Sequence, residues 1–181
     1  PLLAPPPAAS RGVSDRVDIG TAQPLGNLTN NFTVAGWVKP DQVTGLQRIF
    51  GSKVRPNGWS FGLNGSGLRF TTHRVRDYDI AATLTAGQWA HVAVTMKADN
   101  SAEFFVNGQT IGSVAGFAPA NVSTAGFDIG TVLGFADVRG GGEFFKGLLS
   151  DVGVWNRVLT PFELNDVMSG KRGSTNANQM G

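Results

Sequence analysis

The sequence of 181 residues contains no cysteine. This absence excludes disulfide scaffolds, thiol catalysis and metal or iron–sulfur sites held by cysteine ligands. No apolar run approaches the roughly 18 residues that a membrane-spanning helix requires. Charged residues make up only 15% of the chain, compared with about 25% in an average globular domain. With 13 acidic residues and 2 histidines, the chain also has few groups for acid–base catalysis.

Glycine and aromatic residues are abundant instead. The chain has 25 Gly, 12 Phe and 4 Trp, and 41% of its residues are hydrophobic, which argues against disorder. Short runs with β-propensity recur about every 10 residues between turn-forming residues, as in β-sandwiches and barrels. We expect strands at 17–20, 32–39, 48–53, 59–63, 68–72, 89–97, 102–106, 110–114, 127–130 and 148–156.

Two local patterns predict a hairpin and a helix. Asn107 and Gly108 lie between two expected strands and favour a two-residue turn in which both residues have a positive φ. Thr160 and Glu163 have the spacing of a capping box, and proline between them is tolerated at the first helical position. Gly170 suits the position after a helix. We therefore predict one short helix at about 161–169.

The two ends of the chain differ in composition from its middle. Residues 1–12 include four prolines, at positions 1, 5, 6 and 7, and have neither the basic start nor the apolar stretch of a secretion signal. Residues 171–181 are polar and rich in Gly, Ser and Asn. We expect a Pro-rich arm at 1–12, one domain at 13–170 and a polar tail at 171–181. Both ends are expected to contact neighbouring subunits in a homo-oligomer or larger assembly.

Several motifs follow one another in an order that resembles a known family. They are DRVDIG (15–20), FTVAGWVKPD (32–41), RIFGSK (48–53), WSFGL (59–63), GQWAHVAVTM (87–96), AEFFVNGQTIG (102–112), FDIG (127–130) and FKGLLSDVGVWNRVLTPFEL (145–164). The chain resembles the laminin-G-like jelly-roll domains of the concanavalin A-like lectin/glucanase superfamily over about residues 13–170. The resemblance implies an all-β fold, a two-sheet antiparallel jelly-roll sandwich with one short C-terminal helix.

The resemblance also suggests roles for individual residues. Trp37, Trp89 and Trp155 are expected to fill the core between the sheets, because large aromatic residues dominate such cores. His91 is expected to be a hydrogen-bonded histidine within a strand. Asp151, in the family's acidic position before the last strand, is expected to form structural hydrogen bonds in preference to binding a metal.

Catalysis is not expected. Glycosidases on this fold need two carboxyl groups that flank the scissile bond, and relatives carry them on alternate residues of one strand. The only glutamates are Glu103, Glu143 and Glu163, and none lies in such a pattern. The sequence contains no Ser–His–Asp order typical of a catalytic triad, no HExxH zinc-binding motif and no phosphate-binding glycine loop. The sequence therefore favours a binding protein over an enzyme.

A basic segment is the best candidate for a ligand-binding surface. Residues 42–76 contain six Arg or Lys residues and no acid, although the formal net charge of the whole chain is only +2. We select as candidate ligand-binding residues Arg69, His73, Arg74, Arg76 and Tyr78, expected on a loop, because arginine can bind anionic groups and tyrosine can stack on a sugar. The alternatives are a solvated face or a subunit contact. Nucleic acid is disfavoured because no basic helix or nucleic-acid-binding motif accompanies the charge.

The sequence also contains candidate residues for calcium binding and for N-linked glycosylation. Calcium could be bound, as in some relatives, through hard oxygen ligands such as Asp15, Asp18, Asp128 and Asp137, but no Asp-rich calcium loop is present. No metal-ligand set is assigned. Four Asn-x-Ser/Thr sequences are candidate glycosylation sites if the chain passes through a eukaryotic secretory route: Asn27, Asn31, Asn64 and Asn121.

The leading hypothesis is a non-catalytic recognition or structural module that acts in adhesion, or in glycan or protein binding, on an extracellular surface. The alternative is a structural subunit of a virion or extracellular filament, such as a capsid decoration or fibre protein, whose terminal arms contact neighbours. A glycoside hydrolase is a third and disfavoured hypothesis. We expect an extracellular or virion-surface location.

Overall fold

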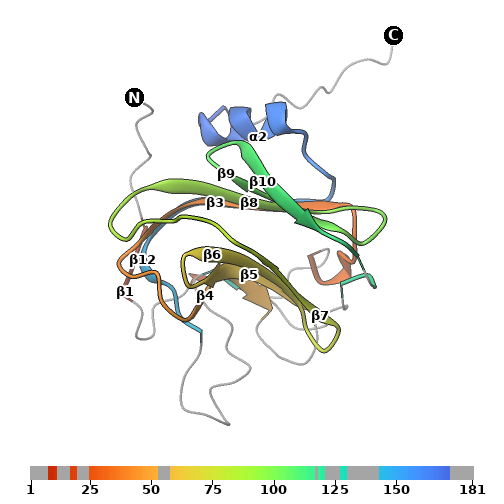
Figure 1. Ribbon diagram of the computed structural model, residues 1–181, viewed down its shortest axis with the longest axis horizontal. Coiled ribbons are helices and arrows are strands. Elements are labelled where there is room, and N and C mark those ends of the chain that lie inside the picture. Colours follow the sequence, from red (N-terminus) through yellow and green to blue (C-terminus); the bar gives the residue numbers. More distant parts are fainter. Residues whose placement is uncertain are drawn as a thin grey trace.

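The computed structural model describes residues 8–11, 17–19, 25–52, 58–116, 118–120, 127–129 and 143–171. Two antiparallel sheets of six strands each are stacked face to face, and one helix lies outside the first sheet (Figure 1). The all-β, two-sheet prediction with a short C-terminal helix is therefore confirmed.

Each sheet combines strands that are distant in sequence. In spatial order, the first sheet contains β1 (Ala8–Arg11), β12 (Lys146–Trp155), β3 (Phe32–Pro40), β8 (Ala90–Met96), β9 (Ala102–Val106) and β10 (Gln109–Val114). The second sheet contains β2 (Val17–Asp18), β11 (Phe127–Ile129), β4 (Leu46–Ser52), β5 (Trp59–Asn64), β6 (Gly67–Thr72) and β7 (Arg76–Ile80). A short 3-10 turn (Leu25–Asn27) precedes β3, and α2 (Pro161–Met168) follows β12.

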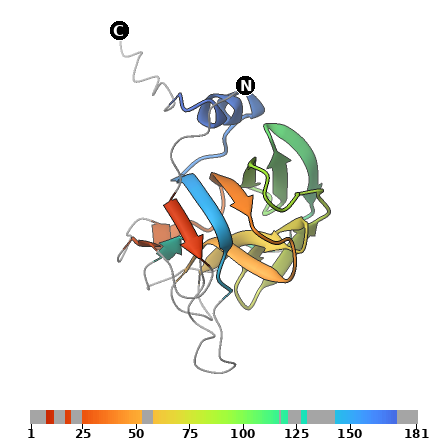
Figure 2. The ribbon, with the colours of Figure 1, turned by 90° about the vertical axis from the view of Figure 1, so that its left-hand side faces the viewer.

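Two strands lie where the sequence analysis expected none. β1 falls within the segment predicted as an arm, and pairs with β12 at the edge of the first sheet (Figure 2). β7 falls within the segment predicted as a loop, although Tyr78 and Ile80 alternate with two aspartates as in a half-buried strand. Residues 1–7 and 172–181 lie outside the described residues, so the predicted arm, tail and domain limits stay predictions.

The core between the sheets is centred on Trp59 of β5, which is completely buried. Its ring centroid lies 4.8 Å from that of Phe32 on β3 and 5.3 Å from that of Phe50 on β4. Phe70 and Tyr78 extend this cluster across β6 and β7. Side chains alternate between the two faces of a strand. The residues next to these inward-facing ones therefore point to the outside of the sandwich.

A second, smaller cluster lies on the outer side of the first sheet, beneath α2. Ala35 of β3, Ala93 of β8 and Phe105 of β9 are covered by Leu159 and by Leu164 of the helix. The helix begins with the predicted capping box, in which the Thr160 amide donates to Glu163 (2.8 Å) and the Glu163 amide donates to the Thr160 hydroxyl (3.3 Å).

The position of the tryptophans corrects the sequence prediction. Trp155 packs against the cluster beneath α2, and Trp37 shares the outward parity of Ala35 on β3. Trp89 contacts Trp37 edge to face at 6.5 Å. The expectation that these three residues fill the inter-sheet core was wrong, because β3 and β8 are apolar on both faces and their sequences do not reveal which face is inside.

The predicted hairpin between β9 and β10 is confirmed, with positive φ at both Asn107 (50°) and Gly108 (77°). Gly108 also lies directly under α2, where an added Cβ would be 2.2 Å from the side-chain oxygen of Asn165. The positive φ favours glycine at this position, and a larger residue would also displace the Asn165 side chain.

Candidate functional site

The predicted ligand-binding segment forms the β6–β7 hairpin, not a loop. Thr72 pairs with Arg76, and the exposed Arg74 lies in the turn between them with φ 63°. The pairing separates the candidate residues onto two faces of the sheet. Arg69 is on the outer face, whereas Tyr78 is on the inner face opposite Phe70.

Two of the candidates are buried and cannot contact a ligand in this conformation. Tyr78 is fully buried, and its hydroxyl lies 3.4 Å from the carbonyl oxygen of Ala118. His73 is only 3% exposed. The expectation that Tyr78 presents its ring to a sugar is therefore wrong. Arg76 covers the Tyr78 ring at 5.1 Å and donates a hydrogen bond to Ala115.

Arg69 is held on the outer face by two carboxylates of β7. Its guanidinium donates to both oxygens of Asp79, at 2.7 and 2.6 Å, and lies 3.1 Å from Asp77. Asn64 donates a further hydrogen bond to Asp79 at 3.1 Å. The hydrogen bond from Arg69 is the main reason that the pKa of Asp79 is lowered, and it also raises the pKa of Arg69.

The same face continues across the sheet toward β4. The register aligns Arg48, Gly62, Arg69 and Asp79 in one row. Arg48 is 1% exposed and donates to Glu143 at 2.5 Å. We call this surface, with its paired residues Arg48, Arg69, Asp77, Asp79 and Glu143, the charged face. A shallow hollow of about 320 Å³ borders it, lined by Asn64, Ser66, Gly67, Asp79, Ile80, Ala81 and Ala82.

The charged face is poorly suited to glycoside hydrolysis. Asp77 and Asp79 alternate on β7 in the manner of a carboxyl pair, a pattern that the loop prediction concealed. A general acid needs a raised pKa, but Arg69 lowers the pKa of Asp79. The three glutamates are also in ion pairs, Glu103 with Lys97, Glu143 with Arg48, and Glu163 with Arg157. Asp79 is therefore suited to accept hydrogen bonds and not to donate a proton.

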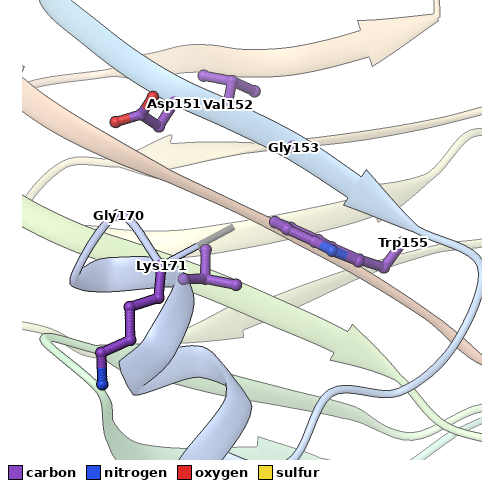
Figure 3. Close-up of a pocket in the computed structure, with 7 residues that line it drawn as sticks. Asp151, Val152, Gly153, Trp155, Gly170 and Lys171 are labelled. Carbon is purple, nitrogen blue, oxygen red and sulfur yellow. The ribbon is translucent and has the colours of Figure 1, made fainter. Parts of the chain in front are cut away.

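A second hollow lies on the other side of the sandwich, between β12 and the end of α2 (Figure 3). We call it the α2 groove. It has a volume of about 350 Å³ and is lined by Asp151, Val152, Gly153, Trp155, Val167, Gly170 and Lys171. Sequence reasoning did not identify this site, because its residues come from two elements and Trp155 was assigned to the core.

His91 differs from its expected role. The ring is 1% exposed and edge-on to Trp37, and neither ring nitrogen has a hydrogen-bond partner among the described residues. Its backbone is bonded to Asn107 instead: the His91 amide donates to the Asn107 side chain at 2.9 Å, and the His91 carbonyl accepts from the Asn107 amide at 2.7 Å. Desolvation lowers the pKa of His91 from 6.5 to about 4. The residue is therefore neutral at physiological pH.

The described residues do not supply a calcium site. Within those ranges, no group of three or more His, Asp or Glu residues is placed to hold a metal ion. Asp15, Asp137 and the side chains of Asp18 and Asp128 lie outside the described part. Calcium binding through those four residues therefore stays a prediction. Likewise, among the helices described none has the length and hydropathy needed to cross a membrane.

The candidate glycosylation sites differ in their surroundings. Asn27, Asn31 and Asn64 are exposed. Asn64 also donates to Asp79, so a glycan there would alter the edge of the charged face. Asn121 lies outside the described residues, as do Lys53 and Arg55 of the basic segment. Glycosylation therefore stays a prediction.

Comparison with known proteins agrees with this architecture. A laminin-G family described as "Concanavalin A-like lectin/glucanases superfamily" matches residues 11–165. No curated protein matches the chain.

Solved structures with a similar fold include several lectin-like domains. A heptameric SAP-like pentraxin from Limulus polyphemus has a TM-score of 0.60 and 22% identity, over 77% of this chain and 70% of that chain. Domain 4 of an extracellular arabinanase from Geobacillus stearothermophilus, in complex with arabinotriose, has a TM-score of 0.60 and 24% identity, over 77% and 66%. The CBM40 domain of a Ruminococcus gnavus sialidase, bound to α2,3-sialyllactose, has a TM-score of 0.68 and 14% identity, over 92% and 98%. At these identities the similarity establishes the fold alone.

Proposed function

Because the chain belongs to the concanavalin A-like lectin/glucanase superfamily, we propose that it acts as a non-catalytic module that binds glycans at an extracellular surface. The observation that carries this proposal is the charged face, where carboxylate, amide and guanidinium groups are held rigidly beside a hollow. Fixed polar groups of this kind bind hydroxyl-rich ligands because little side-chain freedom is lost on binding. The sugar-bound domains of similar fold support the same ligand class.

The turn of the β6–β7 hairpin makes acidic glycans the favoured ligands. Arg74 is exposed, and the described residues contain no ion-pair partner for it. Arg76 is half-buried, and its hydrogen bond is to a neutral carbonyl group. Arginine binds sulfate or carboxylate through charge-assisted, often paired, hydrogen bonds. In this proposal Arg74 and Arg76, at the turn end of the hairpin, bind the acidic group, while Asn64 and Asp79, toward its other end and next to Arg69, bind hydroxyl groups of further sugar units.

A glycan array with sulfated, sialylated and neutral members, followed by titration of the best ligand at several salt concentrations, tests this assignment. Arg74→Asn removes the charge but keeps a residue that tolerates positive φ. It should weaken binding of an acidic glycan about tenfold, as expected for the loss of one charge-assisted hydrogen bond. Lys39→Asn is the matched control, because it removes a charge from the first sheet. Equal binding of acidic and neutral glycans, or equal loss in both variants, would contradict the proposal.

We also propose that the protein is oligomeric and extracellular. One neighbour of similar fold is heptameric, which is consistent with an oligomeric lectin-like protein. Apart from β1 and Lys171, the ends predicted to mediate assembly lie outside the described residues. Light scattering on the intact chain measures its oligomeric state directly.

A further inference from the structure

The α2 groove is separate from the charged face and takes no part in the proposed function. It lies on the outer side of the first sheet, whereas the charged face is the outer side of the second. Its volume of about 350 Å³ falls within the range of roughly 300–1,000 Å³ found for small-ligand sites. The groove therefore needs an explanation of its own.

An aromatic surface lies along the strand side of the groove. The indole of Trp155 extends back along β12 toward Gly153 (Figure 3). A Cβ at residue 153 would lie 2.6 Å from the outer edge of the Trp155 ring. Only glycine lets the indole lie this close to the strand. The side chain thus lines the hollow while it packs against the cluster beneath α2.

A carboxylate stands next to this aromatic surface. The pairing of β12 with β3 shifts between Ser150 and Gly153, and Asp151 within this irregularity has a φ of 49°. Bulges of this type redirect side chains and are frequent at functional sites. Asp151 is exposed, and among the described residues its carboxylate accepts only a long hydrogen bond of 3.5 Å, from the Ser150 hydroxyl. Its oxygens therefore retain most of their capacity to accept hydrogen bonds.

Asp151 and Gly153 lie two residues apart in β12, at the bulge, and both line the groove together with Trp155. The C–H face of a pyranose can pack on an aromatic ring while its hydroxyls donate to a carboxylate. Val167 of α2 provides apolar contact opposite. A small cation would leave most of this volume empty, and cation sites commonly use several aromatic rings.

The local charge favours an uncharged sugar. Lys171 belongs to the lining, but its side chain turns away and its amine lies 3.3 Å from Asp166. Asp151 is the carboxylate of the lining, and it would repel sulfate or carboxylate. We propose that the α2 groove is a second saccharide site, specific for a neutral pyranose, with Trp155 as the stacking residue and Asp151 as the hydrogen-bond acceptor.

Nuclear magnetic resonance of the intact chain tests this site. The chain has 4 tryptophans, whose indole N–H signals can be assigned by single Trp→Phe changes. Methyl glucoside, methyl galactoside and methyl N-acetylglucosaminide serve as neutral probes, and glucosamine sulfate and tetramethylammonium as charged ones. At least one neutral probe should shift the Trp155 signal in a saturable way and leave the buried Trp59 signal unchanged.

Matched variants separate binding from folding. Asp151→Gly removes the carboxylate but suits the positive φ, so the fold should persist while the dissociation constant rises about tenfold or more. Trp155→Phe should also weaken binding, and Arg74→Asn on the other side should leave it unchanged. The proposal is overturned if no neutral probe shifts the Trp155 signal, if Asp151→Gly binds as the parent does, or if tetramethylammonium binds more tightly than the sugars. If Arg74→Asn loses acidic-glycan binding but still binds the neutral probe in the α2 groove, the two sites are independent.

Discussion

The two outer faces of the sandwich are built from the same alternation of strand residues but have opposite chemistry. On the second sheet, the outward residues of β4, β6 and β7 are charged, and they neutralise one another through Arg48–Glu143 and Arg69–Asp79. On the first sheet, three outward residues, Ala35 of β3, Ala93 of β8 and Phe105 of β9, form an apolar cluster beneath α2. The comparison shows that one face is stabilised by paired charges, among which Arg69–Asp79 is partly exposed and Arg48 is buried, and the other by an apolar cluster buried beneath a helix.

The largest effect should come from the helix-covered face. Leu164→Ala removes the one side chain of α2 that is fully buried against the first sheet. We expect a loss of about 3 kcal/mol in the free energy of unfolding, as for other large-to-small changes at buried sites. Urea denaturation measures it. A loss below about 1 kcal/mol would mean that α2 contributes little to the free energy of unfolding. The two faces would then differ less in their contribution to stability than their burial suggests.

The second largest effect should be a loss of stability on acidification, caused by His91 of the first sheet. His91 has a pKa of about 4 when folded, compared with 6.5 for the free group. Between these values the unfolded chain binds more protons, so stability falls as the pH drops from 6.5 toward 4. The loss is at most about 3 kcal/mol. His91→Gln should flatten this part of the pH profile, whereas an unchanged slope would contradict the burial of a neutral imidazole. The contribution of Asp79, whose pKa is lowered from 3.8, is lost only at still lower pH.

The charged face should respond more weakly to mutation. Arg69→Met leaves Asp77 and Asp79 without their shared cation, and the pKa of Asp79 should rise. Because these carboxylates are partly exposed, we expect a stability loss of only about 1 kcal/mol at neutral pH. Adding salt should reduce the difference between variant and parent. Titration of the Asp79 carboxyl by NMR gives the pKa directly, and an unshifted value would show that Arg69 does not hold it.

The smallest effect is expected at Phe162. This residue of α2 is 75% exposed, so Phe162→Ser should change the free energy of unfolding by less than about 0.5 kcal/mol. It therefore serves as a control for Leu164→Ala on the same helix. A large loss at Phe162, seen in the same denaturation experiment and dependent on protein concentration, would mean that this side of the helix is covered in an assembly.

Local signals in the sequence predicted the secondary structure well. The ten expected strands are present with small shifts of their ends, and the capping box and the Asn107–Gly108 turn are as predicted. These features depend on residues close in sequence, such as Thr160 and Glu163 three positions apart. The order of motifs was sufficient to identify the fold, because that order reflects the whole chain.

Tertiary structure decided which face each side chain occupies, and with it the candidate sites. Tyr78 is inside because β7 pairs with β6 in a register that places it opposite Phe70, and a loop prediction could not supply that register. The basic segment 42–76 is neutralised in part by Asp77, Asp79 and Glu143, which lie just beyond it or far along the chain. Trp155 and Asp151 form a groove only because α2 packs back on β12. The sequence alone determined the strands, the turns and the helix cap, whereas these contacts depend on long-range pairing that no local pattern encodes.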